Sequence, residues 1–393
     1  MSDLAAASAK RDLRIDFMRG LALVMIYVNH TRGNHFELFT SRNFGFSDAA
    51  DLFVLLAGMA AALAYHRGFT EGPARATALK IWRRTGKLYV AHATTTVITI
   101  GLFFAAALAW NDPSLTTEIN LRRVMADPQR ALIGIATLGH QLGYFNILPM
   151  YMAILAALPA MLLAMRGNVR VMLAGSLALW LLAGTAGLNV PSYPNPGFWF
   201  FNPLSWQLLF CLGFAWIVLS RDGFRLPRSR LLTGLAVVYL IVSALWVQLD
   251  FWRFVPAHQL DGTIWGFDKT YLAWPRVLHL LALAYVFAMS PLPAYLLRLA
   301  STNPLVLMGR HGLAIYCAGS VLSMAGLILL KELGSTIVLD GTVLVTGFLI
   351  QWAIARFLEP AHAPAPSHAK QPSHGAPPSA LRARAFPRER GEG

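Results

Sequence analysis

Long apolar runs alternate with short polar segments along almost the whole chain. A helix needs about 17–25 apolar residues to cross a bilayer. The runs that reach this length are residues 15–33, 48–66, 87–109, 146–164, 170–188, 203–220, 231–249, 273–290, 304–330 and 337–358. The pattern therefore predicts an all-α fold: a polytopic integral membrane protein with about ten transmembrane helices.

The rest of the chain divides around this membrane domain. Residues 1–14 form a cytoplasmic N-terminal segment, 15–358 the membrane domain, and 359–393 a basic tail rich in proline and alanine, which we expect to be disordered and cytoplasmic. The apolar stretch from Ala131 to His140 is too short to span a bilayer and is typical of a re-entrant or interfacial piece.

Composition agrees with a lipid environment. Hydrophobic residues make up 56% of the chain and charged residues only 13%, whereas soluble domains carry about 25% charged residues. The net charge of +14 raises the question of nucleic acid, but the basic residues lie in loops and tails instead of forming one stripe, which excludes that class. Cys211 and Cys317 lie far apart in apolar runs, so we expect two packing residues and neither a disulfide nor a metal site.

The basic residues also predict the orientation. With the N-terminus inside, cytoplasmic segments hold 22 of the 33 Lys and Arg, external segments hold 8, and the remaining three lie within spans. The positive-inside rule therefore places both termini in the cytoplasm. The run after Arg19 ends in Tyr27, Asn29 and His30 instead of a small-residue cleavage site, so we expect the first helix to be retained.

A cluster of basic residues follows the second span. The segment 66–87 contains Arg67, Arg75, Lys80, Arg83, Arg84 and Lys87. Two interpretations remain open: an orientation signal that also touches anionic membrane lipid, or a docking surface for a phosphate-bearing cytosolic ligand.

Charged residues inside spans are costly and are the first candidates for function. In the first span, Asp16 and Arg19 are three residues apart and can pair on one helix face. Arg19 and His30 are eleven apart, about three turns and a rise of about 16 Å, so they share a face at opposite ends of the helix. His30 can serve as a general base near neutral pH; the alternative is a hydrogen-bonded packing residue.

The second span opens with Asp48 and Asp51, level with His30 on the outer side. One of these carboxylates could hold the His30 imidazole in a single tautomer and stabilise its protonated form. The equally weighted alternative is that Asp48 or Ser47 caps the helix and that Asp51 lies in its first turn, where the helix dipole favours negative groups.

Further cations open later spans. Arg276 and His279 share a face of the eighth span, and Arg310 and His311 open the ninth. We expect Arg276 and Arg310 near the cytoplasmic ends of their spans, where together with Arg19 they could bind an anionic ligand; the alternative is snorkelling to lipid phosphates. His311 receives no role.

The motifs of the first two spans resemble those of a known family. Arg19-Gly20 followed by His30 reproduces the first-helix pattern of the membrane acyltransferase 3 superfamily, and residues 51–58 resemble its second-helix motif. More narrowly, the chain resembles the OpgC group, which adds succinyl groups to osmoregulated periplasmic glucans. The supporting segments are 146–151, 202–210, 276–282 and 307–313, and the likeness runs from about residue 10 to 357.

The resemblance implies an O-acyltransferase in the bacterial inner membrane. A cytosolic acyl-CoA, succinyl-CoA or acetyl-CoA, would be the co-substrate, and a hydroxyl of an extracytoplasmic glycan such as periplasmic glucan the acceptor, with no tightly bound cofactor and no metal. His30 would be the catalytic base with Asp48 or Asp51 beside it, and Arg19 would help to bind the donor. Arg276, His279 and Arg310 are further candidates for substrate binding.

A secondary transporter or flippase of a small anionic or glycolipid substrate is the main alternative. Transporters commonly place acidic residues at mid-membrane and build sites from paired broken helices. Here the acidic residues near a span interior, Asp48 and Asp51, lie at one end, and matched breaks in two halves are not evident. The sequence therefore favours the enzyme.

Overall fold

The computed structural model describes residues 12–165, 168–256 and 263–359, and this part of the chain is helical, with one isolated β-bridge between Pro191 and Phe198. The helices are α1 (Leu13–His30), α2 (Ala49–Thr70), α3 (Ala74–Ala109), α4 (Arg122–Ala126), α5 (Pro128–Ala136), α6 (Ile147–Met165), α7 (Val169–Thr185), α8 (Pro203–Arg221), α9 (Arg230–Gln248), α11 (Trp274–Met289), α12 (Leu292–Leu296), α13 (Pro304–Arg310), α14 (Gly312–Leu333) and α15 (Ile337–Leu358). Short 3-10 helices are η1 (His35–Phe39), η2 (Ser41–Asn43), η3 (Pro113–Asn120) and η4 (Phe251–Phe254). The predicted tail, 359–393, lies almost wholly outside the described residues.

The predicted fold class is confirmed: the protein is an all-α, multi-pass membrane protein. Among the described residues, seven helices are long and apolar enough to cross a bilayer, namely α2, α3, α6, α8, α9, α14 and α15. α7 and α11 are apolar but shorter, and α1 has only 18 residues. Each of the ten expected spans thus corresponds to helical structure. In the part of the chain that the structure describes, seven helices also meet the length and hydropathy expected of a membrane-spanning helix.

The expected ninth span, 304–330, is not one helix. It breaks into α13 and α14 at His311, whose backbone dihedrals (φ −100°, ψ 33°) are not helical. The expected short piece at 131–140 is the nine-residue helix α5 followed by a turn, too short to span. Cys211 and Cys317 are both free, as predicted.

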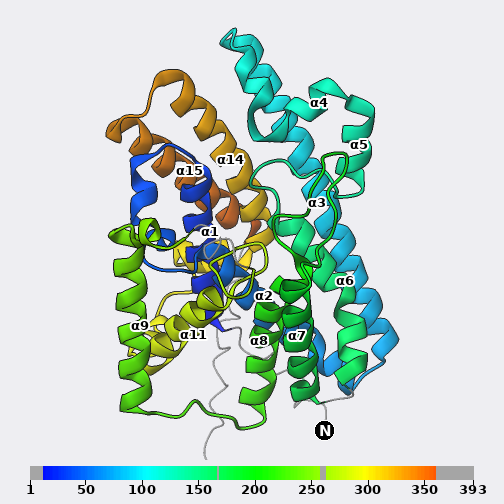
Figure 1. The fold of residues 1–393 in the computed structure, drawn as a ribbon, viewed down its shortest axis with the longest axis vertical. Coiled ribbons are helices and arrows are strands. Elements are labelled where there is room, and N and C mark those ends of the chain that lie inside the picture. Colours follow the sequence, from blue (N-terminus) through cyan, green and yellow to red (C-terminus); the bar gives the residue numbers. More distant parts are fainter. Residues whose placement is uncertain (1–11, 166–167, 257–262, 360–393) are drawn as a thin grey trace, which may run out of the picture. The chain divides into compact units, whose positions relative to one another are not determined.

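Glycines bring helix pairs into close contact at the centre of the fold (Figure 1). α1 crosses α13 where Gly20 faces the backbone of Leu305 and Gly309 faces that of Asp16. α2 crosses α8 in the same way, since Gly58 lies against the backbone of Phe210. Helices in membranes associate largely through such close packing of small residues. The two crossings therefore fix α1 and α2, which carry the candidate site.

Gly58 provides a test of this packing. A methyl group there would overlap the carbonyl oxygen of Phe210, which is backbone and cannot move aside cheaply. We expect Gly58→Ala to destabilise the protein by about 1–3 kcal/mol, the usual cost of overpacking. Gly175 of α7 has nothing within 4 Å of a built methyl group, so Gly175→Ala is the matched control and gains helix propensity. Thermal unfolding in detergent measures both, and equal melting temperatures would contradict the account.

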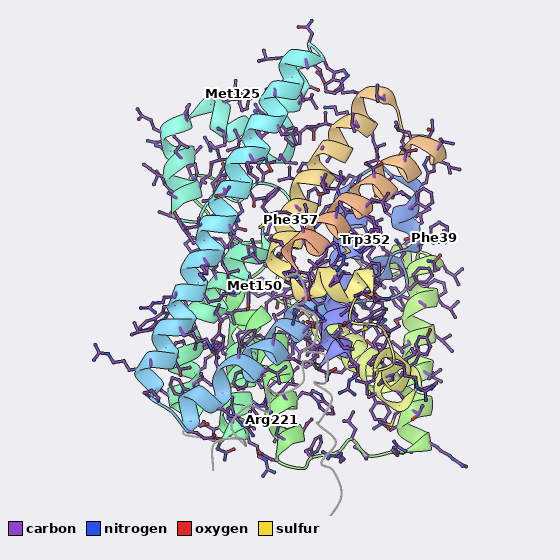
Figure 2. All side chains as sticks on the ribbon, turned by 180° about the vertical axis from the view of Figure 1, so that it is seen from behind. Phe39, Met125, Met150, Arg221, Trp352 and Phe357 are labelled. Carbon is purple, nitrogen blue, oxygen red and sulfur yellow. The ribbon has the colours of Figure 1, made fainter. Side chains whose placement is uncertain are left out.

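Short helices pack near the C-terminal half of α3. This helix has 36 residues, about 54 Å at 1.5 Å per residue, and so exceeds the roughly 30 Å hydrocarbon core. η3, α4 and α5 gather around its C-terminal half, where a separate core cluster includes Phe103, Leu121 and Phe145. In Figure 2, Met125 of α4 and Arg221 at the end of α8 lie at opposite ends of the view.

Candidate active site

A cluster of four charged side chains lies where α2 and α11 begin. Arg276 Nη2 donates to Asp51 Oδ2 at 2.6 Å and to Asp48 Oδ2 at 3.2 Å, while Lys269 Nζ donates to Asp48 Oδ2 at 2.5 Å. The Asp51 side chain is fully buried and that of Arg276 is 11% exposed. Two anions therefore balance two cations, as buried charges require.

The start of α2 positions both carboxylates. Asp48 is the N-cap and accepts from the backbone N–H of Ala50 at 2.9 Å, while Asp51 accepts from the backbone N–H of Asp48 at 2.8 Å. This reciprocal capping box satisfies backbone donors that the first turn leaves free. The capping interpretation of the two aspartates is thus confirmed. The same carboxylates also bind cations from another part of the chain: Asp48 caps through Oδ1 and binds cations through Oδ2, while Asp51 uses Oδ2 for both.

The segment before α11 brings Lys269 to the site. Trp206 Nε1 donates to the Lys269 carbonyl at 2.9 Å, and the backbone N–H of Asn202 donates to the Thr270 carbonyl. Both donors lie at the start of α8, which crosses α2 closely. The backbone of this loop is therefore fixed against α8, and the Lys269 ammonium reaches Asp48.

His30 is the last residue of α1 and lies beside this cluster. The charges of Lys269 and Asp48 both act on its imidazole ring. The His30 ring centroid is 4.8 Å from that of Tyr144, in the loop before α6. Burial raises the pKa of the Tyr144 hydroxyl, so the phenol stays uncharged beside His30 at neutral pH.

The contacts of the two carboxylates differ from the arrangement expected of a direct orienter. Within the described residues, no hydrogen bond joins His30 to Asp48 or Asp51; their oxygens bind Arg276, Lys269 and backbone amides instead. Asp48 acts on the His30 ring through its charge. A role of either aspartate in catalysis stays a prediction.

His279 extends the same site along α11. The backbone N–H of Ser47 donates to His279 Nδ1 at 3.3 Å, and Ser47 Oγ lies 2.7 Å from the same atom. Nδ1 is therefore an acceptor, which leaves the ring proton on Nε2. Gly45 lies against the Nε2 side of the His279 ring.

The other expected cations lie elsewhere. Arg19 Nη1 donates to the Gly309 carbonyl at 3.1 Å and lies 3.4 Å from Asp16 Oδ1, where α1 crosses α13. Arg310 is the last residue of α13, and its Nη2 donates to the Ser301 carbonyl, before the same helix, at 3.4 Å. These two arginines thus belong to one region, as expected.

The expected grouping of Arg276 with Arg19 and Arg310 was wrong. Arg276 lies in the first turn of α11 and pairs with Asp48 and Asp51, at the His30 end of α1. The physical reason is the direction of the helix: α11 begins at the same end of the molecule as α2, so its first turn meets the first turn of α2. Arg19 lies three turns away along α1.

Three residues near the site were not among the sequence candidates: Lys269, Ser47 as the partner of His279, and Tyr144. Lys269 and Tyr144 lie in loops between apolar runs, and their partners are more than 100 residues away in sequence. Lys269 is the one cation in the segment 263–275, which is rich in aromatic residues, and this was the signal in the sequence that could have identified it. Among the described residues, no group of three or more His, Cys, Asp and Glu side chains lies close enough to hold a metal ion.

The fold and the site together define a class: a multi-pass helical membrane protein with a histidine at the end of a short helix, beside a buried and charge-balanced cluster. The model of one protein family, described as OpgC protein, matches residues 11–363, and the chain belongs to this family. Membership implies a membrane acyltransferase that modifies glucan. Neither a curated protein sequence nor a solved structure matches the chain.

Proposed function

We propose that this protein transfers an acyl group from a cytosolic acyl-CoA to a hydroxyl of an extracytoplasmic glucan, with His30 as the general base. The observation that carries the proposal is the position of His30: it ends α1 beside Tyr144 and within reach of the charges of Asp48 and Lys269. Family membership supplies the reaction class.

The reaction needs one base that also returns the proton. His30 takes the proton of the acceptor hydroxyl as its oxygen attacks the thioester carbonyl, forming a C–O bond. The tetrahedral intermediate then collapses, the C–S bond breaks, and the departing CoA thiolate receives the proton from the imidazolium. Such proton transfer contributes about 10²–10⁴ in rate.

Asp48 and Asp51 serve this reaction indirectly. Their oxygens hold Arg276 and Lys269, and the negative charge of Asp48 favours the imidazolium that forms during the reaction, while Lys269 opposes it. In this proposal the aspartates are positioning residues, and His30 is the catalytic residue.

The donor side lies at the other end of α1. Arg19 and Arg310 lie where α1 crosses α13. The basic segment 66–87 contains the end of α2 and the start of α3. Figure 1 places the turn between α2 and α3 at the same end as the end of α8. The phosphates of acyl-CoA would find cations there.

The charge pattern supports a proposal for the orientation and the compartment. Because basic residues favour the cytoplasmic side, His30 would lie toward the periplasm and both termini in the cytoplasm of a bacterial cell, with the protein in the inner membrane. The acyl group would be succinyl or acetyl. Anionic membrane lipid is a further partner of the basic segment.

A reconstituted assay tests the proposal. Purified protein in detergent would be given succinyl-CoA or acetyl-CoA together with a glucan, and both free CoA and acylated glucan would be measured. We expect the two products in equal amounts. If the detergent assay forms no ester, and the protein reconstituted in vesicles instead moves glucan or acyl-CoA across the bilayer, the transporter alternative is correct.

A further inference from the structure

A cavity of about 420 Å³ lies beside the charge cluster. Its wall combines two kinds of side chain: aromatic rings, from Phe46, Trp252 and Phe267, and polar groups, from Asn43, Asp48 and Arg276. This volume falls within the range of about 300–1,000 Å³ that is usual for small-molecule sites. Gln248 of α9, the neighbour of the lining residue Val247, donates to the Asn43 carbonyl at 2.8 Å.

The aromatic rings are packed against one another and form a continuous apolar surface. The Trp252 and Phe267 ring centroids are 4.9 Å apart at an interplanar angle of 87°. Phe46 lies 4.9 Å from Phe267 and 5.9 Å from Trp252. Each ring is therefore held in place by the other two, which makes the surface rigid before any ligand arrives.

The polar side of the wall has little net charge. Arg276 is neutralised by Asp48 and Asp51, and the third charged lining residue, Arg42, lies 3.8 Å from Glu37. An anionic ligand would need an uncompensated cation here.

We propose that this cavity binds one glucosyl unit of the acceptor glucan; this rests on the function proposed above. A pyranose ring is uncharged, carries hydroxyls on its rim and exposes C–H groups on its faces. Its C–H face can stack on the electron-rich face of an aromatic ring, and its hydroxyls can bind the polar lining residues Asn43 and Asp48.

The site has a direct relation to catalysis. Asp48 lines the cavity, and its charge also acts on the His30 ring. His30 itself does not line the cavity, so in this proposal one sugar unit binds in the cavity and a neighbouring unit of the same chain reaches the imidazole. The cavity would select the acceptor, while His30 would act on a hydroxyl of the bound chain.

Equilibrium dialysis tests this inference without any acyl donor. The probe is a radiolabelled glucose hexasaccharide, and the protein is the purified full-length chain in detergent. We expect Trp252→Ala to weaken binding by about tenfold or more, the loss usual for an aromatic anchor. Trp252→Phe, which retains a ring, should bind nearly as wild type. Trp265 is 79% exposed and does not line the cavity, so Trp265→Ala is the matched control.

The outcomes separate the two proposals. Equal binding by wild type, Trp252→Ala and Trp265→Ala would overturn the glucosyl site, and wild-type glucan acylation in the reconstituted assay would then still support the proposed function. Tighter binding of glycerol phosphate than of the hexasaccharide, lost in Trp252→Ala, would assign the cavity to a lipid headgroup and also overturn the inference. Glucan binding that depends on Trp252, without acylation from any donor, would support the site and remove the proposed reaction.

Discussion

Replacing His30 with alanine is expected to reduce acyl transfer by about 10²–10⁴-fold, the contribution of general base catalysis. The protein should still fold, because His30 ends α1 and no hydrogen bond from its ring to the described residues is present. The loss should appear in kcat, since the imidazole acts on the proton in the transition state and not on binding. Transfer of labelled acyl groups to glucan by the purified variant measures this.

His35 offers the matched histidine control. It lies five residues further along, and its Nδ1 pairs with Asp340 Oδ2 at 2.6 Å instead of facing the charge cluster. His35→Asn keeps a side-chain donor for Asp340, and we expect it to retain transfer activity. Equal activity of His30→Ala and His35→Asn would show that His30 is a packing residue and that the base lies elsewhere.

Replacing Arg276 with alanine is expected to cost about 3–5 kcal/mol of stability, the usual effect of breaking a buried ion pair from one side. The variant leaves Asp51 fully buried without its cation. The double variant Asp51→Asn, Arg276→Gln removes both charges and should be more stable than Arg276→Ala. The stability of the wild type, of Arg276→Ala and of the double variant is measured by denaturation in detergent, with circular dichroism as the signal.

Arg253 is the control for this prediction. It is exposed and donates to the Leu249 carbonyl at 3.1 Å, so Arg253→Ala should change stability by no more than about 0.5 kcal/mol. If Arg276→Ala were as stable as Arg253→Ala, the charge cluster would not be a structural element, and its place in the site would need another reason.

The fold could be predicted from the sequence because each membrane helix is a local feature. An apolar run of sufficient length must form a helix, since no water satisfies its backbone in lipid. The break at His311 was missed because hydropathy is a local measure. α13 and α14 are both apolar, and the break lies next to Gly309, where α13 packs on α1. A hydropathy pattern does not predict which distant helices contact each other.

The site could be predicted only in part. His30, Asp48 and Asp51 were found as polar residues at the ends of spans, and the capping of α2 follows from local spacing. Lys269 was missed because its contact with Asp48 joins residues 221 positions apart. Arg276 was placed at the wrong end, although its position after an outer loop already indicated the side on which α11 begins.

The most direct test of the central claim is mass spectrometry of extracytoplasmic glucans from cells that make the wild-type protein, His30→Ala or no protein. We predict a succinyl or acetyl mass increment that requires the wild-type protein and disappears in His30→Ala at equal expression. Identical glucan profiles in the three strains would contradict the account.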